Sequence, residues 1–200
     1  MLEGLDGSGT TTQLRLLSER LAREGVRHAA TFEPTEGSVG ILLRSILARN
    51  ASAHPRTVAL LFAADRSEHI HDPTGGIEAR TARGELVVSD RYLFSSLAYQ
   101  SIECGLDWVS TLNESFPLPQ TAIFIDTPVE VCQERLARRS LEELYDGTSF
   151  QAKVRQTYLE IFERYRGSGM RIEIIDGNRP AGLIHGDIWK TIRLMPIKGT

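Results

Sequence analysis

A glycine-rich stretch near the start of the chain, residues 3–13, has the composition of a phosphate-binding loop. Gly4, Gly7 and Gly9 permit backbone conformations with positive φ, which let successive N–H groups point inward toward an anion. Leucines at helical spacing follow, so the loop leads into a helix N-terminus, whose dipole also favours phosphate. The stretch fits the pattern G-x-x-x-x-G-K-[ST] except at Thr10, which stands in place of the lysine. Taken alone, it is equally compatible with a glycine-rich turn that binds no ligand.

Three further residues have types suited to a magnesium–nucleotide complex. Thr11 occupies the position whose hydroxyl contacts Mg²⁺ in such loops. Asp90 follows the apolar run 86–88 and either accepts a hydrogen bond or binds Mg²⁺ through water, and the sequence leaves both interpretations open. Arg91 comes directly after this predicted buried strand, where an isolated guanidinium needs an anion or a carboxylate partner.

Strands and helices alternate along the chain, which predicts an α/β fold with a doubly wound parallel sheet and right-handed crossovers. The strands are expected before Gly4 and at 26–32, 86–88, 122–126 and 171–175. The first helix is expected to run from the loop to Gly25, and another is expected to begin with Pro128 in its first turn. The other helices are expected at 37–50, 55–71, 77–83, 95–103, 150–166 and 181–194. Ligands bind at the carboxyl ends of such strands, so the loop, Glu33 and Asp90-Arg91 should converge on one crevice.

The first strand and the segment 135–149 are unusual. Only residues 1–3 remain for a strand that should be central, so we expect Met1 to lie inside it, with the true start of the protein upstream. Residues 135–149 are rich in charge and poor in apolar anchors, which predicts a mobile segment. Its arginines would otherwise form an ordinary solvated helix face.

The bulk composition restricts the class of protein. Two hundred residues predict a single domain, 1–200, and a net charge of −3 gives no case for nucleic acid as a partner. The cysteines, Cys104 and Cys132, fit no metal-binding spacing and are expected to be reduced thiols. No signal peptide opens the sequence, and the longest apolar run, 58–64, is too short for a bilayer, so we expect a cytoplasmic protein without a membrane partner.

Four motifs occur together in one order: the loop at 3–13, E-P-T-E-G at 33–37, L-F-A-A-D-R at 61–66 and D-R-Y-L-F-S-S-L-A-Y-Q at 90–100. With them the chain resembles the thymidylate kinases along nearly its whole length. The run 90–100 is the most specific of the four, because few other P-loop kinases carry it. The resemblance implies a P-loop kinase fold with a closing segment (LID) at about 135–149. It also implies transfer of the γ-phosphoryl group of ATP to dTMP with Mg²⁺, by a homodimer.

The resemblance further implies a role for individual residues of this chain. Arg91 would hold the dTMP phosphate, Arg66 would reach the thymine, and Phe62 would stack on it. Ser96 would face the thymine edge, and Tyr99 would crowd the 2′ position of the sugar. The residues implied to bind ATP are Gly4, Asp6, Gly7, Ser8, Gly9, Thr10, Thr11 and Thr12. Those implied to bind dTMP are Glu33, Arg44, Phe62, Arg66, Arg91, Ser96, Tyr99 and Gln100. Thr11 and Asp90 would contact the metal, and the catalytic residues would be Asp6, Arg91, Arg138 and Arg139.

Less specific interpretations of some of these residues stay open. Phe62, on an apolar helix face, would ordinarily belong to the core. Asp65 and Arg66 could form a surface helix pair of little energetic value.

The chemistry of this reaction needs positioning more than proton transfer. A phosphate monoester has a second pKa of about 6, so the acceptor is already an ionised nucleophile at neutral pH and no general base is required. Two anions must instead be held together, by positioning and charge neutralisation. No lysine precedes Lys153, so we expect an arginine to replace the lysine missing at Thr10. Arg138 or Arg139 is the expected residue, with Arg135 in reserve.

Two alternatives to an active dTMP kinase remain from the sequence. Thr10 alone supports a catalytically impaired homologue that binds nucleotide and has a regulatory role. A kinase for another deoxynucleoside monophosphate is the second alternative, since dUMP differs from dTMP by one methyl group.

Overall fold

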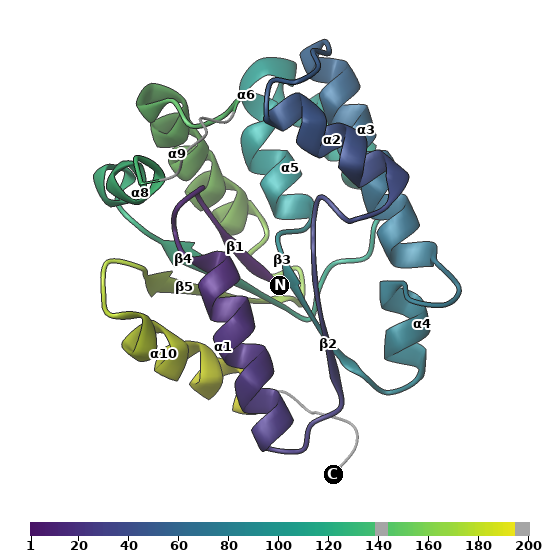
Figure 1. The fold of residues 1–200 in the computed structure, drawn as a ribbon, viewed down its shortest axis with the longest axis vertical. Helices are drawn as coiled ribbons and strands as arrows, with labels where there is room; N and C mark the ends of the chain where they lie inside the picture. The colour runs from purple at the N-terminus through teal and green to yellow at the C-terminus, as the bar shows by residue number, and fades with distance from the viewer. Residues whose placement is uncertain (139–143, 195–200) are drawn as a thin grey trace.

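A computed structural model describes residues 1–138 and 144–194 of the chain. At its centre lies a five-stranded sheet in the order β2-β3-β1-β4-β5, and every neighbouring pair of strands is parallel (Figure 1). The strands are β1 (Leu2–Gly4), β2 (His28–Phe32), β3 (Leu86–Asp90), β4 (Thr121–Asp126) and β5 (Arg171–Asp176). The parallel α/β architecture predicted from the alternation of elements is thereby confirmed.

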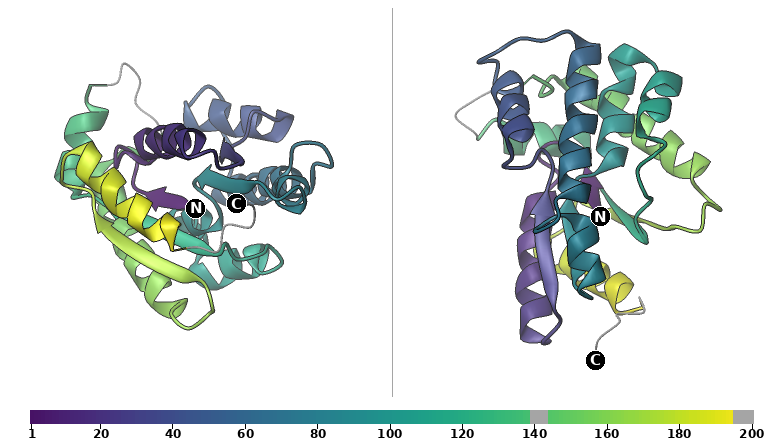
Figure 2. Two further views of the ribbon diagram at one scale, coloured as in Figure 1. Left: turned by 90° about the horizontal axis from the view of Figure 1, so that it is seen from below. Right: turned by 90° about the vertical axis from the view of Figure 1, so that its right-hand side faces the viewer.

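Helices cover both faces of this sheet because its central strands are apolar on both faces. On β4, Ala122 and Phe124 join one hydrophobic core, whereas Ile123 and Ile125 join a second. The second core packs against α1 (Thr10–Arg23) and α10 (Ala181–Arg193), which lie side by side (Figure 2). The first core packs against α5 (Leu93–Tyr99) and α9 (Thr148–Arg164).

The remaining helices are α2 (Ser38–Leu47), α3 (Pro55–His71), α4 (Ile77–Ala82), α6 (Ser101–Cys104), α7 (Leu106–Asn113) and α8 (Val129–Leu136). Three expectations need correction. The helix expected at 95–103 is two helices, with Gln100 between α5 and α6. Pro128 has extended ψ of 141° and precedes α8 instead of lying in its first turn. The sequence analysis did not predict α7, which follows Gly105 at a φ of 84°.

The short first strand is integrated in the sheet. The terminal amino group of Met1 donates to the carbonyl of Thr121 at 2.7 Å, and the carbonyl of Met1 accepts from the N–H of Ile123 at 2.9 Å. These bonds continue the β1–β4 ladder by one residue beyond Leu2. The strand therefore delivers the glycine-rich loop to the carboxyl edge of the sheet.

The polar segment 135–149 begins in the last turn of α8 and ends in the first turn of α9. Residues 139–143 lie outside the described part of the chain, and with them the predicted site residue Arg139. In the described residues, no helix has the length and apolar character that crossing a membrane requires.

Candidate active site

The glycine-rich loop connects β1 to α1 in the conformation that the sequence predicts. Gly7 and Gly9 have φ values of 84° and 99°, in the left-handed region that a side chain disfavours. Gly7 also lies against α8, where an added Cβ would come within 2.8 Å of the carbonyl oxygen of Cys132. The loop residues from Leu5 to Gln13 line one wall of a cavity of about 480 Å³. This cavity is formed by a helix N-terminus and a curled backbone, which together suit a phosphate.

Three arginines also line this cavity: Arg91, Arg135 and Arg179. Arg135 comes from α8, and its Nη1 donates to the carbonyls of Gly7 at 3.1 Å and Ser8 at 3.2 Å. Its guanidinium therefore rests on the loop itself. Arg179 comes from the turn between β5 and α10 and pairs with Asp187 at 2.9 Å. Arg135 is the arginine that the sequence offers as a second choice after Arg138 and Arg139, and Arg179 is not among the predicted site residues.

Arg138, expected as a main donor-side residue, is exposed one turn beyond Arg135. Within the described residues, Arg135 is thus the arginine of this helix that lines the cavity. The roles of Arg138 and Arg139 stay predictions.

A hydroxyl and a carboxylate meet beside the loop, as the predicted metal site requires. Thr11 Oγ1 donates a hydrogen bond to Oδ2 of Asp90, the last residue of β3, at 2.6 Å. The other oxygen, Asp90 Oδ1, is buried and has no hydrogen-bond partner in the described part of the chain. An unpaired buried carboxylate oxygen is costly unless a cation or a water satisfies it. These two residues therefore fit Mg²⁺, which takes few protein ligands beside phosphate oxygens and waters.

Arg91 is held at the junction of β3 and the loop. Its Nη2 donates to Asp6 Oδ1 at 2.6 Å, and its Nη1 donates to the carbonyl of Gly4 at 2.9 Å and to Ser95 Oγ at 3.1 Å. Its φ of 70° is rare for a residue with a side chain and indicates a tightly determined backbone. The other carboxylate oxygen of Asp6 accepts from Gln151 Nε2 at 3.1 Å, which connects the loop to α9.

Tyr99 and Gln100 lie buried beside this junction. The Tyr99 hydroxyl accepts a hydrogen bond from the backbone N–H of Asp6 at 3.0 Å, and the Arg91 guanidinium lies 5.3 Å from the centre of its ring. Burial raises the pKa of Tyr99, so the phenol is neutral. Gln100 Oε1 is buried without a partner in the described residues. The structure thus brings Tyr99 to the loop, while its contact with a sugar stays a prediction.

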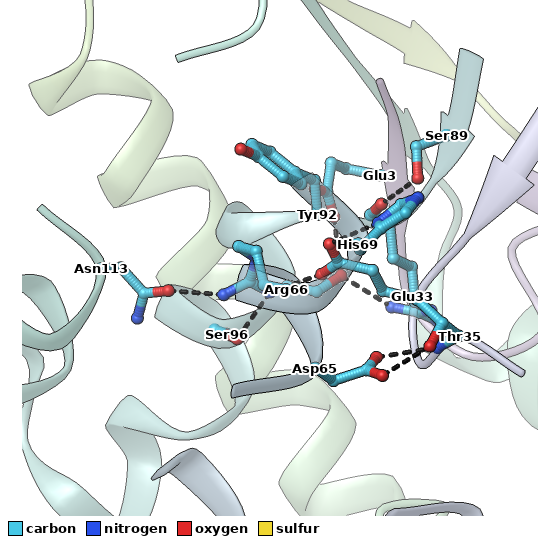
Figure 3. A network of polar contacts seen from close by, with 12 residues as sticks. Glu3, Glu33, Thr35, Asp65, Arg66, His69, Ser89, Tyr92, Ser96 and Asn113 are labelled. Carbon is cyan, nitrogen blue, oxygen red and sulfur yellow. Dashed lines mark hydrogen bonds and ion pairs between the residues drawn. The ribbon is translucent and has the colours of Figure 1, made fainter. Parts of the chain in front are cut away.

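A second group of predicted residues forms a buried polar network (Figure 3). Arg66 on α3 is only 1% exposed and lies between Asn113 and Glu33. Its Nη1 donates to Asn113 Oδ1 at 2.5 Å, and its Nη2 donates to Glu33 Oε2 at 2.7 Å and to Ser96 Oγ at 3.0 Å. Glu33 also contacts His69 Nδ1 at 3.0 Å. The network fixes the guanidinium and leaves Arg66 Nε buried without a partner among the described residues.

Asp65, the neighbour of Arg66, is equally buried and supports the segment 33–37. Its carboxylate accepts from the N–H of Thr35 at 2.8 Å and from the Thr35 hydroxyl at 2.6 Å (Figure 3). The alternative that Asp65 and Arg66 form an exposed surface pair is therefore wrong. Each side chain satisfies a different partner inside the protein.

Arg44 and Phe62 lie at the border of the same region. Arg44 donates to the backbone carbonyls of Pro34, at 2.6 Å, and Thr35. Phe62 is half-buried and packs on the small core of Leu43, Ile46 and Val58. Phe62 thus contributes to this core without being fully enclosed by it.

The described geometry brings together the loop, Asp6, Thr11, Asp90, Arg91 and Tyr99, and it groups Glu33, Arg66 and Ser96 in the adjoining network. Sequence reasoning missed Asn113, His69, Gln151 and Glu3. Glu3 alone carried a signal, because a carboxylate within a predicted buried strand requires an explanation.

A doubly wound parallel sheet with a glycine-rich loop between β1 and α1, a Thr–Asp pair and facing arginines defines a P-loop phosphotransferase. The family model for thymidylate kinase matches residues 2–188 of this chain. The chain is 41% identical over 197 residues to a putative thymidylate kinase of Treponema pallidum, covering 96% of this chain and 93% of that protein. It is 39% identical over 178 residues to a putative thymidylate kinase of Aeropyrum pernix, covering 89% and 85%.

A probable thymidylate kinase of Thermococcus onnurineus is 35% identical over 198 residues, covering 94% of this chain and 93% of that protein. The chain therefore belongs to the thymidylate kinase family, enzymes whose general reaction is the ATP-dependent phosphorylation of dTMP.

Proposed function

We propose that this enzyme brings ATP and dTMP together on either side of Arg91, with the ATP phosphates in the loop cavity. Transfer of the γ-phosphoryl group then gives dTDP and ADP. The observation that carries the proposal is the contact of Arg91 with Asp6, because it joins the end of β3 to the phosphate-binding loop. A guanidinium at this junction can neutralise an acceptor phosphate as it approaches the donor.

On the acceptor side, we assign dTMP contacts to Glu33, Arg44, Phe62, Arg66, Arg91, Ser96, Tyr99 and Gln100. We assign Arg66 to a carbonyl of the base on the family motif that contains it, and its Nε is a donor without a partner among the described residues. The half-buried ring of Phe62 supports stacking on thymine. Besides their proposed contacts with dTMP, Glu33 holds Arg66 and Arg44 holds the segment 33–37 in place.

On the donor side, we assign ATP to the loop residues Gly4, Asp6, Gly7, Ser8, Gly9, Thr10, Thr11 and Thr12. Thr11 and Asp90 hold Mg²⁺, which neutralises charge on the β- and γ-phosphates when bound. Asp6 keeps Arg91 oriented beside the loop.

The positive charge normally supplied by the loop lysine comes from arginine in this proposal. Arg138 or Arg139 approaches the γ-phosphate when the segment 135–149 closes over ATP. The contacts of Arg135 with Gly7 and Ser8 support a permanent cation at the loop. A guanidinium remains charged and offers two parallel donors, so it can replace an ammonium here.

We further propose a single domain, 1–200, that acts as a homodimer in the cytoplasm. Large apolar side chains are exposed on the neighbouring helices α2 and α3, namely Ile41, Leu42 and Leu60, and such side chains suit burial against a second copy. Free Cys104 and Cys132 fit a reducing compartment. Sedimentation of the purified chain tests the oligomeric state.

A coupled assay of ADP release with dTMP, dUMP, dCMP and dAMP, each with ATP and Mg²⁺, tests the substrate. We expect dTMP to have the highest kcat/KM. A higher value for another monophosphate would favour the kinase of a different deoxynucleotide. Binding of dTMP and ATP without turnover would favour the regulatory homologue that Thr10 suggests.

A further inference from the structure

Glu3 is a fully buried carboxylate in the middle of the central strand β1, directly before the phosphate-binding loop. Its exposed fraction is 0%, and it therefore touches neither solvent nor the loop cavity. Glu3 Oε2 accepts hydrogen bonds from Ser95 Oγ at 2.7 Å and from the Tyr158 hydroxyl at 3.0 Å. Burial raises the pKa of Glu3 to about 7. A carboxylate in such a place lowers stability unless its partners compensate for the lost hydration.

Ser95 connects this carboxylate to Arg91. The Ser95 hydroxyl has a single proton, and it donates this proton to Glu3. Its lone pairs are consequently available to Arg91 Nη1, which donates to Ser95 Oγ at 3.1 Å. The Tyr158 hydroxyl, which comes from α9, lies 2.8 Å from the same Ser95 oxygen and helps to fix the position of this hydroxyl.

The orientation of the Arg91 guanidinium depends on these contacts. A guanidinium has five N–H donors. In the described part of the chain, Arg91 donates hydrogen bonds to Gly4, Ser95 and Asp6. Its remaining N–H groups have no partner there. Gly4 and Ser95 together fix Nη1, so the free donors keep one direction and are available to an anion.

We infer that Glu3 is a positioning residue that acts through Ser95 to hold Arg91 in the orientation that binds the acceptor phosphate. The inference rests on the proposed function of Arg91. Glu3 also differs from an ordinary structural carboxylate, because the described residues offer it no direct ion pair and its hydrogen bond to Ser95 connects it to the Arg91 guanidinium.

The direct test is Glu3→Gln, assayed at a pH well above the pKa of Glu3, where the carboxylate is ionised. The variant keeps the shape of the side chain but removes its charge. The amide nitrogen can donate to Ser95, which turns the hydroxyl proton toward Arg91 and weakens the Arg91–Ser95 bond. We expect the KM and the Kd for dTMP to rise about tenfold, whereas those for ATP change less than about twofold. Titration calorimetry with dTMP gives the Kd independently of turnover.

Ser95→Ala and the double variant distinguish positioning from stability. If Glu3 acts through Ser95, Ser95→Ala weakens dTMP binding by a factor similar to that of Glu3→Gln. The double variant then binds dTMP little more weakly than Ser95→Ala alone. Tyr158→Phe is the matched control, because it removes another hydroxyl from Glu3 but leaves the Ser95 link to Arg91, and we expect a smaller effect on dTMP. If Glu3→Gln does not fold, the comparison of Ser95→Ala with Tyr158→Phe carries the test.

An unchanged Kd for dTMP in Glu3→Gln, an equal loss of dTMP and ATP binding, or full additivity with Ser95→Ala would overturn the positioning role. Each of these results leaves the proposed function intact. Failure of the wild type to bind dTMP at all would instead contradict the proposed function, and the positioning role with it.

Discussion

Nη2 of Arg91 lies 2.6 Å from Oδ1 of Asp6, so an arginine at the end of β3 is paired with a carboxylate inside the phosphate-binding loop. The two residues are separated by 85 positions in the sequence. Because both side chains are only partly buried, the pair remains accessible to an incoming phosphate. In the proposed function, this contact joins the donor site to the acceptor site.

Arg91→Ala should nearly abolish turnover while the fold is retained. Loss of a charge-assisted contact of this kind costs on the order of 2–5 kcal/mol, so we expect kcat/KM for dTMP to fall at least about thirtyfold. Circular dichroism and the Tm check the fold. Arg91→Lys is the matched control: it keeps the charge but loses the fork, and its loss should be intermediate. Near-normal kcat/KM in Arg91→Ala would refute the assignment of the acceptor phosphate to this residue.

Phe62→Ala should weaken the binding of dTMP far more than the binding of ATP. If thymine stacks on Phe62 as proposed, removing the ring takes away that surface, and we expect the Kd for dTMP to rise about tenfold. Val58→Ala is the control, since Val58 is fully buried in the same small core as part of Phe62. The Val58→Ala variant should lower the Tm but should change the Kd for dTMP and the Kd for ATP by similar factors. Equal losses of dTMP and ATP binding in Phe62→Ala would show that this ring serves the core alone.

Thr11→Ala and Asp90→Asn should both raise the Mg²⁺ concentration needed for half-maximal rate. Thr11 Oγ1 and Asp90 lie 2.6 Å apart, and each variant removes one oxygen suited to the ion or to its water shell. The measurement is the rate at fixed ATP over a Mg²⁺ titration. Thr157→Ala, a change at a half-buried threonine of α9 whose hydroxyl donates to the carbonyl of Lys153, is the matched control and should not move the midpoint. If both site variants kept the wild-type midpoint, the metal assignment would be wrong.

Alanine at one of Arg135, Arg138 or Arg139 should lower kcat about a hundredfold, the scale of losing one charge stabiliser in the transition state. Arg166→Ala, a change at an exposed arginine paired with Glu163, is the control and should have little effect. Thr10→Lys should then partly restore the rate of the impaired variant, because a lysine in the loop supplies the missing charge. If all three alanine variants kept the wild-type kcat, no arginine of this segment would replace the loop lysine.

The sequence predicts much of this fold because its signals are local. Apolar runs such as 86–88 and 122–125 specify buried parallel strands, and the glycine pattern at 4–9 specifies the loop. The 55–71 helix was predicted with its observed bounds, since Pro55 begins it as the first helical residue. At Gln100 the structure divides the predicted helix into α5 and α6 although this residue keeps helical dihedral angles, φ −72° and ψ −23°, and sequence periodicity alone does not detect that division.

The candidate site was less predictable because its contacts join distant segments. Arg135 reaches the carbonyl of Gly7, 128 positions away, and only the packing of α8 on the loop brings them together. Asn113 binds Arg66 from a helix that the sequence did not indicate. Arg66 was identified through its motif, but its ion pair with Glu33 required the fold.

The rate of ADP formation by the unaltered chain, with saturating dTMP, ATP and Mg²⁺, shows whether a loop without lysine supports phosphoryl transfer. Transfer without this lysine requires that arginines supply the missing charge, and we predict ADP formation that depends on dTMP and yields dTDP in equal amount. Calorimetric titrations with dTMP and with ATP accompany the assay. Binding of both nucleotides with no dTMP-dependent ADP formation would contradict this prediction.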